Sequence, residues 1–160
     1  MRVFDASSIV WAWDQYPESL FPPLWKLMEV EIRAGEIVIP EVAMREIGHV
    51  SPDCQDWLTI AGLKPAPITN EALSAARKIK AQLGIVDDNY HSDGVDENDI
   101  LVIAVARTLA AELVSEEAVQ RSLPLNKAKY RIPATCRLPS AGVKCIRFVD
   151  YLRSFGRPIQ

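Results

Sequence analysis

Short apolar segments alternate with amphipathic helical segments along most of this chain. Strands are predicted within RVFD at the start, in a segment ending at Ile39, at ELV (112–114) and within VKCIRF near the end. Parallel strands cannot be joined by tight hairpins and need a crossover, which is usually a helix. The alternation therefore predicts an α/β fold, a single domain over residues 1–160 with a central parallel sheet of four to five strands flanked by helices.

Capping residues and helix breakers mark where the helices begin and end. A helix is expected from Pro40 to about Val50, because proline suits the first helical turn. The next long helix is capped by Thr69 or Asn70 and ends before Gly84. A polar loop precedes the apolar helix DILVIAVARTLAAEL, which we expect to be central.

Composition bounds the class of protein. The chain is 49% hydrophobic and 24% charged, as in an ordinary globular protein. It has no apolar run of 18 residues and no signal-peptide pattern, so we expect neither a membrane span nor export. Cys54, Cys136 and Cys145 show no CxxC spacing, which favours reduced thiols in a cytoplasmic protein over a zinc site.

The net charge of −3 conceals a strong asymmetry along the chain. Residues 1–117 hold 20 acidic against 9 basic side chains, whereas residues 118–160 hold one acidic against 9 basic ones. One interpretation is an anion-binding face beside an acidic site. The other is that the two halves neutralise each other across the fold.

Acidic residues are expected at one edge of the sheet, because ligands of open parallel sheets bind beyond the carboxyl ends of the strands. Asp5 ends the first strand, Glu116 and Glu117 follow the strand ELV, and Asp99 begins the apolar helix. Glu46 lies two turns into the helix after the second strand. Carboxylates this close repel unless a cation neutralises them, and Mg²⁺ or Mn²⁺ prefers such oxygen ligands.

Each acid also has a structural alternative. Asp96 and Asp99 have the spacing of a capping box. Glu46 could be a solvated helix residue, and Glu117 could pair with Arg107 or Arg121. Asp5 has the fewest structural roles, because burying an unpaired carboxylate is costly.

Three motifs together resemble the PIN-domain nucleases, which include the VapC-like toxin ribonucleases. VFDASSIV is similar to their first strand and acid, DILVIAVA to their third-acid helix, and LVSEE to their fourth-acid strand end. The tail YRIPATCRLPSAGVKCIRFVDYLRSFG and the segment LFPPLWKL resemble an uncharacterised PIN-like subfamily that carries an IP..C stretch.

The resemblance implies a PIN-like fold and Mg²⁺- or Mn²⁺-dependent endoribonuclease activity. It implies catalytic and metal-binding roles for Asp5, Glu46, Asp99 and Glu117, although the family usually has aspartate at the last position. Asp96 and Glu116 are further possible metal ligands. Many members are toxins silenced by an antitoxin protein, and members often form homodimers.

Substrate contacts follow from the same interpretation. Ser7 matches a small polar residue beside the first acid of the family, and Lys127, Lys129 and Arg131 are expected to hold the RNA backbone. Trp11 is one of four tryptophans that could stack on bases, although helical spacing favours core packing for Trp25 and Trp57.

Two other functions remain open. One is a catalytically weak PIN-like module that binds RNA or a protein. The other is a phosphatase with an aspartyl nucleophile, which would need a second acid where this chain has Ser7.

Overall fold

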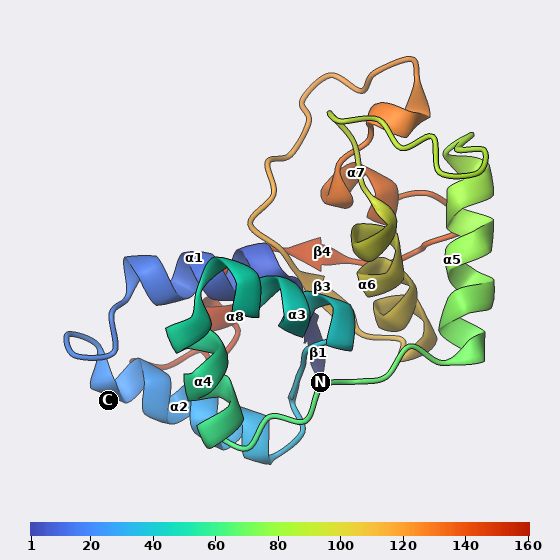
Figure 1. Ribbon diagram of the computed structural model, residues 1–160. Helices are drawn as coiled ribbons and strands as arrows, with labels where there is room; N and C mark the ends of the chain where they lie inside the picture. Colours follow the sequence, from blue (N-terminus) through green and yellow to red (C-terminus); the bar gives the residue numbers. More distant parts are fainter.

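The computed structural model describes residues 1–160 and has a four-stranded parallel sheet with the strand order β2-β1-β3-β4 (Figure 1). The predicted α/β class and the parallel sheet are therefore confirmed. The elements are β1 (Arg2–Phe4), α1 (Ala6–Gln15), α2 (Pro22–Arg33), β2 (Ile37–Val38), α3 (Glu41–Val50), α4 (Pro52–Ile60), α5 (Asn70–Gln82), α6 (Glu97–Thr108), β3 (Glu112–Val114), η1 (Lys127–Lys129), α7 (Ile132–Cys136), β4 (Cys145–Ile146) and α8 (Phe148–Arg153).

Helix ends follow the local signals with small shifts. Thr69, not Asn70, caps α5, because its hydroxyl accepts a hydrogen bond from the backbone N–H of Ala72 at 3.1 Å. Pro40 is the residue before α3 and not its first turn, since its ψ of 149° is extended. Its neighbour Ile39 is buried but lies outside β2. Differences of one residue are usual at helix and strand ends.

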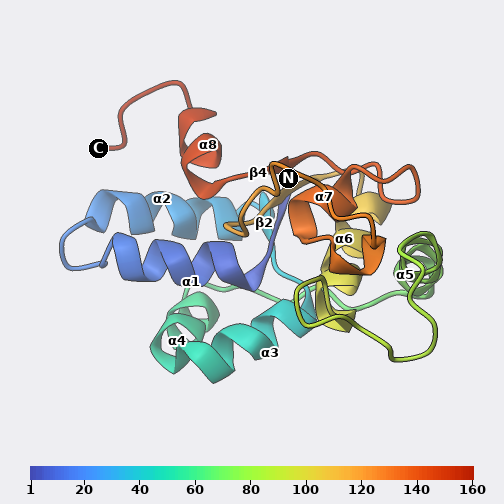
Figure 2. The same cartoon turned by 90° about the horizontal axis from the view of Figure 1, so that it is seen from above.

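Helices cover the sheet on both sides. Figure 2 shows α1 between α2 and the α3–α4 pair, with α5 on the outer side of α6. Helix α6 is buried along most of its length, which explains its apolar sequence. The longest helix, α5, has 13 residues, and none of the helices could cross a lipid bilayer.

An aromatic cluster joins the two ends of the chain. The ring of Phe4 in β1 lies 5.0 Å from that of Tyr151 and 6.4 Å from that of Phe148, both in α8.

Trp25 is buried and contacts Trp57 at 4.8 Å between ring centroids. The core roles expected for these two tryptophans are confirmed, although Trp57 is only partly buried.

The strand order creates a crevice between β1 and β3. After β1 the chain leads to β2 on one side, and after β3 it leads to β4 on the other. Ligands of open α/β sheets bind at such a switch point, beyond the carboxyl ends of the strands. Asp5 directly follows β1 at this position, and Ser115 directly follows β3.

Candidate active site

The end of β1 places Asp5 in the crevice. Phe4 pairs with Val114 in the parallel register, and the N–H of Asp5 donates to the carbonyl of Val114 at 3.0 Å. Asp5 therefore lies beside Ser115, one residue past the strand end. It is only 4% exposed, the most deeply buried of the predicted acids.

Two serine hydroxyls hold the Asp5 carboxylate. Ser7 donates to its Oδ2 at 2.5 Å and Ser115 donates to the same oxygen at 3.0 Å. Burial raises the pKa of Asp5, and the two serine hydrogen bonds lower it in part. The Ser7 hydroxyl also accepts the N–H of Glu116 at 3.1 Å, so Ser7 ties the ends of β1 and β3 together.

This network changes the interpretation of Ser7. Its only hydroxyl proton is donated to Asp5, so it cannot donate to a substrate phosphate without releasing that carboxylate. Ser7 therefore positions Asp5, and its contact with substrate stays a prediction. Ser115 has the same role, and the sequence did not single it out.

Helix α6 begins with a capping box formed by two of the candidate acids. The side chain of Asp96 accepts from the N–H of Asp99 at 3.0 Å, and Oδ2 of Asp99 accepts from the N–H of Asp96 at 2.9 Å. The structural alternative is thus realised for both residues. We call Asp5, Glu46, Asp99 and Glu117 together the acidic cluster. The capping box leaves Asp99 available to this cluster, because its Oδ1 has no hydrogen-bond partner.

The pKa of Asp99 reports its surroundings. This pKa is raised to about 8, chiefly by burial and further by the charges of Asp96, Asp5 and Glu117. The hydrogen bond from the Asp96 backbone opposes it. A helix cap alone would lower an acid's pKa, so burial outweighs the cap here, and the neighbouring carboxylates add to the increase.

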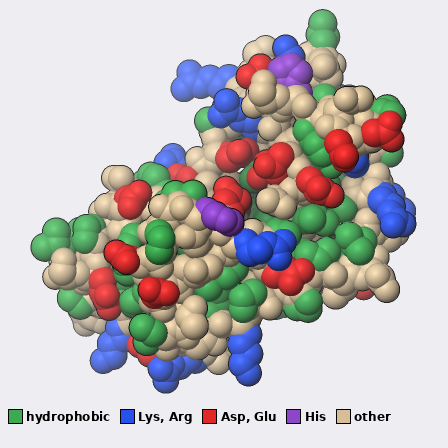
Figure 3. All heavy atoms as spheres, in the orientation of Figure 1, with side chains coloured by type: hydrophobic (Ala, Val, Ile, Leu, Met, Phe, Trp, Pro, Cys, Tyr) green, Lys and Arg blue, Asp and Glu red, His purple; other side chains and the backbone are tan.

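Glu46 joins this group from helix α3. As a whole residue it is exposed, yet lost solvation on its inner side is the main cause of its raised pKa. The charges of Asp5, Asp96 and Glu117 raise it further. Four separate segments thus bring carboxyl groups within electrostatic range of one another (Figure 3 shows acidic side chains across the middle of this face).

Glu117 is the fourth member. Its Oε2 accepts from the N–H of Ile132 at 2.8 Å, while its Oε1 has no partner. Burial raises its pKa, the hydrogen bond from Ile132 lowers it, and the charges of Asp5 and Arg131 act in opposite directions. It forms no ion pair with Arg107 or Arg121, so that alternative is wrong.

Glu116 faces other partners. Its Oε1 accepts from the N–H of Phe148 at 2.7 Å, and its Oε2 accepts from Nε of Arg147 at 3.3 Å. These contacts attach the start of α8 to the end of β3. Because both oxygens are engaged there, we leave Glu116 out of the proposed metal ligands.

The basic segment 127–131 lies beside the cluster. The carbonyl of Tyr130 accepts from the N–H of Val95 at 2.9 Å, next to the capping box of α6. The side chain of Gln120 clamps the segment, donating to the carbonyl of Lys129 at 3.0 Å and accepting from the N–H of Arg131 at 2.9 Å. Arg131 is close enough to Glu117 to lower its pKa.

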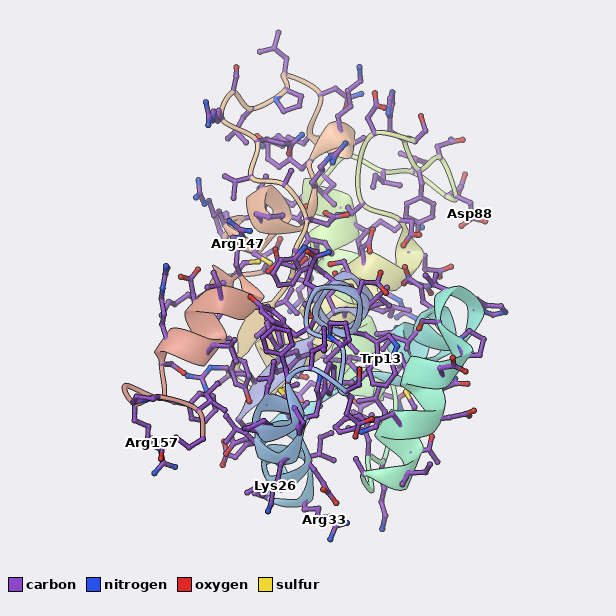
Figure 4. All side chains as sticks on the ribbon, turned by 90° about the vertical axis from the view of Figure 1, so that its left-hand side faces the viewer. Trp13, Lys26, Arg33, Asp88, Arg147 and Arg157 are labelled. Atoms are coloured by element: carbon purple, nitrogen blue, oxygen red, sulfur yellow. The ribbon has the colours of Figure 1, made fainter.

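Three other basic residues of the tail are engaged in ion pairs. Lys144 pairs with Glu112, Arg147 with Glu116, and Arg153 with Asp150. Figure 4 shows Arg157 on the opposite side of the view from Asp88, and Arg157 lines a pocket together with Lys26 of α2. Lys144 and Arg147 thus neutralise acids of the first 117 residues, as the second interpretation of the charge asymmetry expects. The anion-binding face stays a prediction.

The oxygen ligands of the acidic cluster suit a hard divalent cation, but they are not arranged as a ready metal site. All the donors are carboxylate oxygens, and several of them are free. Burial raises their pKa values most, and mutual repulsion, which a cation would relieve, raises them further. No three Asp, Glu, His or Cys side chains lie close enough together to hold a metal ion as they stand. Binding would therefore require side-chain rotation.

Comparisons with known proteins agree with this fold. A family model described as "Domain of unknown function (DUF4411)" matches residues 3–157. The crystal structure of VapBC2 from Rickettsia felis bound to a DNA fragment from their promoter is similar, with a TM-score of 0.56 and 16% identity over 92% of this chain and 98% of that chain. No curated protein matches. The fold is PIN-like, as the sequence predicts.

Proposed function

The chain belongs to the DUF4411 family, and from this premise we propose that it is a metal-dependent endoribonuclease. One observation carries the proposal. Carboxyl groups from four segments are held in electrostatic contact at the switch point of a PIN-like sheet, with raised pKa values that a cation would reverse. Perturbed acids at such a place are typical of functional sites.

Asp5, Glu46, Asp99 and Glu117 would hold Mg²⁺ or Mn²⁺, with Asp96 as a further possible ligand. A bound divalent ion would neutralise these acids and stabilise the negative charge that develops when a phosphodiester is hydrolysed. Ser7 and Ser115 fix one oxygen of Asp5, which keeps this carboxylate oriented before a cation arrives. The expected products carry a 5′-phosphate and a 3′-hydroxyl.

Lys127, Lys129 and Arg131 would bind the RNA backbone. They are exposed or half-buried, and the Gln120 clamp holds their segment beside the acids. RNA cannot approach an uncompensated acidic edge, so nearby cations must offset the repulsion.

We also propose that the protein is the toxin of a toxin–antitoxin pair, acting in the cytoplasm and kept inactive by an antitoxin protein. The support is the fold shared with the Rickettsia felis VapBC2 structure. A homodimer is part of this proposal, and its test is the mass of the purified protein in solution.

The test of the enzyme is cleavage of 5′-labelled RNA with Mn²⁺, with Mg²⁺ and with EDTA. Asp5→Asn should reduce cleavage at least 100-fold, in the range known for removing one group that stabilises transition-state charge. Asp56→Asn, an exposed acid on α4, is the matched control and should cleave normally. Equal cleavage by wild type and Asp5→Asn would refute the assignment.

A PIN-like binding module without catalysis is the second candidate. This candidate is favoured by Glu117, which is longer than the aspartate that PIN-domain nucleases usually have there. The Glu117 side chain is also hydrogen-bonded to the backbone of α7. The same assay separates the two functions, because a binding module would retain labelled RNA in a metal-insensitive complex and leave it intact.

A further inference from the structure

A cavity of about 260 Å³ lies between helices α1 and α3. Its lining residues are Ala6, Ser7, Val10, Trp11, Asp14, Glu46 and Val50. It shares Ser7 with the network that holds Asp5, and it shares Glu46 with the acidic cluster. A group bound there would therefore lie next to the candidate active site.

The sequence builds this cavity by helical periodicity. Ser7, Trp11 and Asp14 are spaced by four and three residues on α1, so they project from one face of that helix. Glu46 and Val50 are spaced by four on α3 and face them. The shape thus follows from two packed helices, not from a mobile loop.

One wall is apolar and carries an aromatic ring. Val10 and Val50 line it together with Trp11. Trp11 is half-buried, and its ring packs at 5.7 Å from Tyr16 and 6.2 Å from Phe148. These contacts hold the indole in place. A held aromatic face is what unpaired nucleobases stack on.

The polar groups of the cavity select the kind of ligand. Asp14 and Glu46 are carboxylates, and no Lys or Arg lines the cavity. A phosphate would be repelled there, whereas a flat group with N–H donors would be accepted. Asp14 is exposed and has no ion-pair partner, so it is free to accept hydrogen bonds.

We propose that this cavity binds the base of an unpaired guanosine in RNA, next to the acidic cluster where the phosphodiester would be hydrolysed. Guanine is the nucleobase whose Watson–Crick edge presents two adjacent N–H donors. These donors match the two oxygens of the Asp14 carboxylate. Cytosine and adenine present one amino group beside a ring acceptor, which a carboxylate repels. This inference rests on the proposed ribonuclease function and adds a preference of its active site for guanosine.

The experiment measures binding without cleavage, in an Asp5→Asn background. The probes are fluorescent hexaribonucleotides, all-uridine or with a single guanosine. The guanosine-containing strand should bind about tenfold more tightly, within the range of one stacked and paired base. Trp11→Ala should abolish this difference, and Trp11→Phe should retain most of it because the ring stays.

Asp14→Asn changes an exposed side chain and should leave the fold intact. It should remove the preference for guanosine, while Asp56→Asn on α4 should keep it. Free guanosine should displace the labelled strand. Equal binding of both strands, or a guanosine preference that survives both Trp11→Ala and Asp14→Asn, would overturn the proposal.

Two further arms separate the alternatives. An arginine-rich peptide is the competing probe, since a guanidinium could also stack on Trp11 and pair with Asp14. Displacement by that peptide and not by guanosine would overturn the proposal in favour of a protein partner. If wild type shows no metal-dependent cleavage, the proposed function is refuted. The binding comparison would still test the guanosine site.

Discussion

At the scale of single residues, Asp5 combines deep burial with neighbours of the same charge. Two serine hydroxyls compensate only part of its lost hydration, and the pKa remains raised. Natural proteins keep such a residue where function requires it, at some loss of stability. Replacing the charge should therefore stabilise the metal-free protein.

We predict that Asp5→Asn, measured in EDTA at pH 8, raises the free energy of unfolding by about 1 kcal/mol and the melting temperature by about 3 °C. The asparagine oxygen can still accept one serine hydroxyl, while the repulsion is removed. Calorimetry of wild type and variant is the measurement. A lower melting temperature for both Asp5→Asn and Asp99→Asn would instead indicate structural roles.

The raised pKa of Asp99 predicts how the stability of the metal-free protein depends on pH. In the folded state the carboxyl takes up its proton near pH 8, whereas an unfolded aspartate does so at about 3.9. Between these values the folded state binds more protons, so the free energy of unfolding falls as pH rises. The melting temperature in EDTA should therefore decrease from pH 5 to pH 8.

Two controls identify the source of that decrease. Asp99→Asn keeps an acceptor for the capping box but loses the titration, so its melting temperature should decrease less over this range. Added Mn²⁺ should also flatten the curve for wild type. An unchanged curve in Asp99→Asn would mean that other groups cause the pH dependence.

At the scale of elements, the start of α6 has two roles. The capping box satisfies backbone N–H groups at the first turn, and the same turn presents Asp99 to the cluster. Segment 127–131 docks against this turn through the Tyr130 carbonyl. The docking sets basic side chains beside acidic ones, so RNA binding should depend on this segment.

We predict that neutralising Lys127, Lys129 and Arg131 together weakens RNA binding for all sequences. Each phosphate contact contributes about 0.7 to the slope of log K against log salt on single strands, so the slope should flatten by about two units. Affinity would be measured at several salt concentrations in an Asp5→Asn background. The preferred cleavage position, tested in the catalytically active protein, should not change, because backbone contacts do not specify sequence.

The matched control for this segment lies elsewhere in the tail. Neutralising Arg153 and Arg157, which lie outside segment 127–131, should leave the slope unchanged. An equal effect of both sets would mean that net charge alone governs binding. An unchanged slope in the triple variant would place segment 127–131 away from the RNA.

At the scale of the whole molecule, the two ends of the chain share one core. The buried apolar residues form a single contiguous cluster, and Phe148 and Tyr151 of α8 pack on Phe4 of β1. Glu116 adds a hydrogen bond to the start of α8. The last strand and helix are therefore part of the domain and not an appended tail.

We predict a single cooperative unfolding transition, with the same midpoint by calorimetry and by tryptophan fluorescence. Phe148→Ala should destabilise the protein by about 3–5 kcal/mol, as is usual for truncating a fully buried phenylalanine. Phe155→Ala, at a half-buried position after α8, should cost clearly less. Two separate transitions would show that the C-terminal part folds independently.

The sequence by itself determined most of the local structure and the identity of the acids. The alternation of strands and helices, the Thr69 cap and the strand-end position of Asp5 follow from short-range rules about periodicity, capping and burial. The resemblance to PIN-domain nucleases then predicted the fold. These features depend on neighbours in the chain, which a sequence displays directly.

Only the tertiary structure decided which partners those residues meet. It showed that Ser7 and Ser115 share one oxygen of Asp5, that both oxygens of Glu116 are engaged away from the cluster, and that the tail's charges are divided among several places. It also placed Trp11 and Asp14 opposite Glu46 across a cavity. Side chains far apart in the sequence interact only after the sheet register and helix packing bring them together, and the distances that govern electrostatics and hydrogen bonding are fixed at that stage.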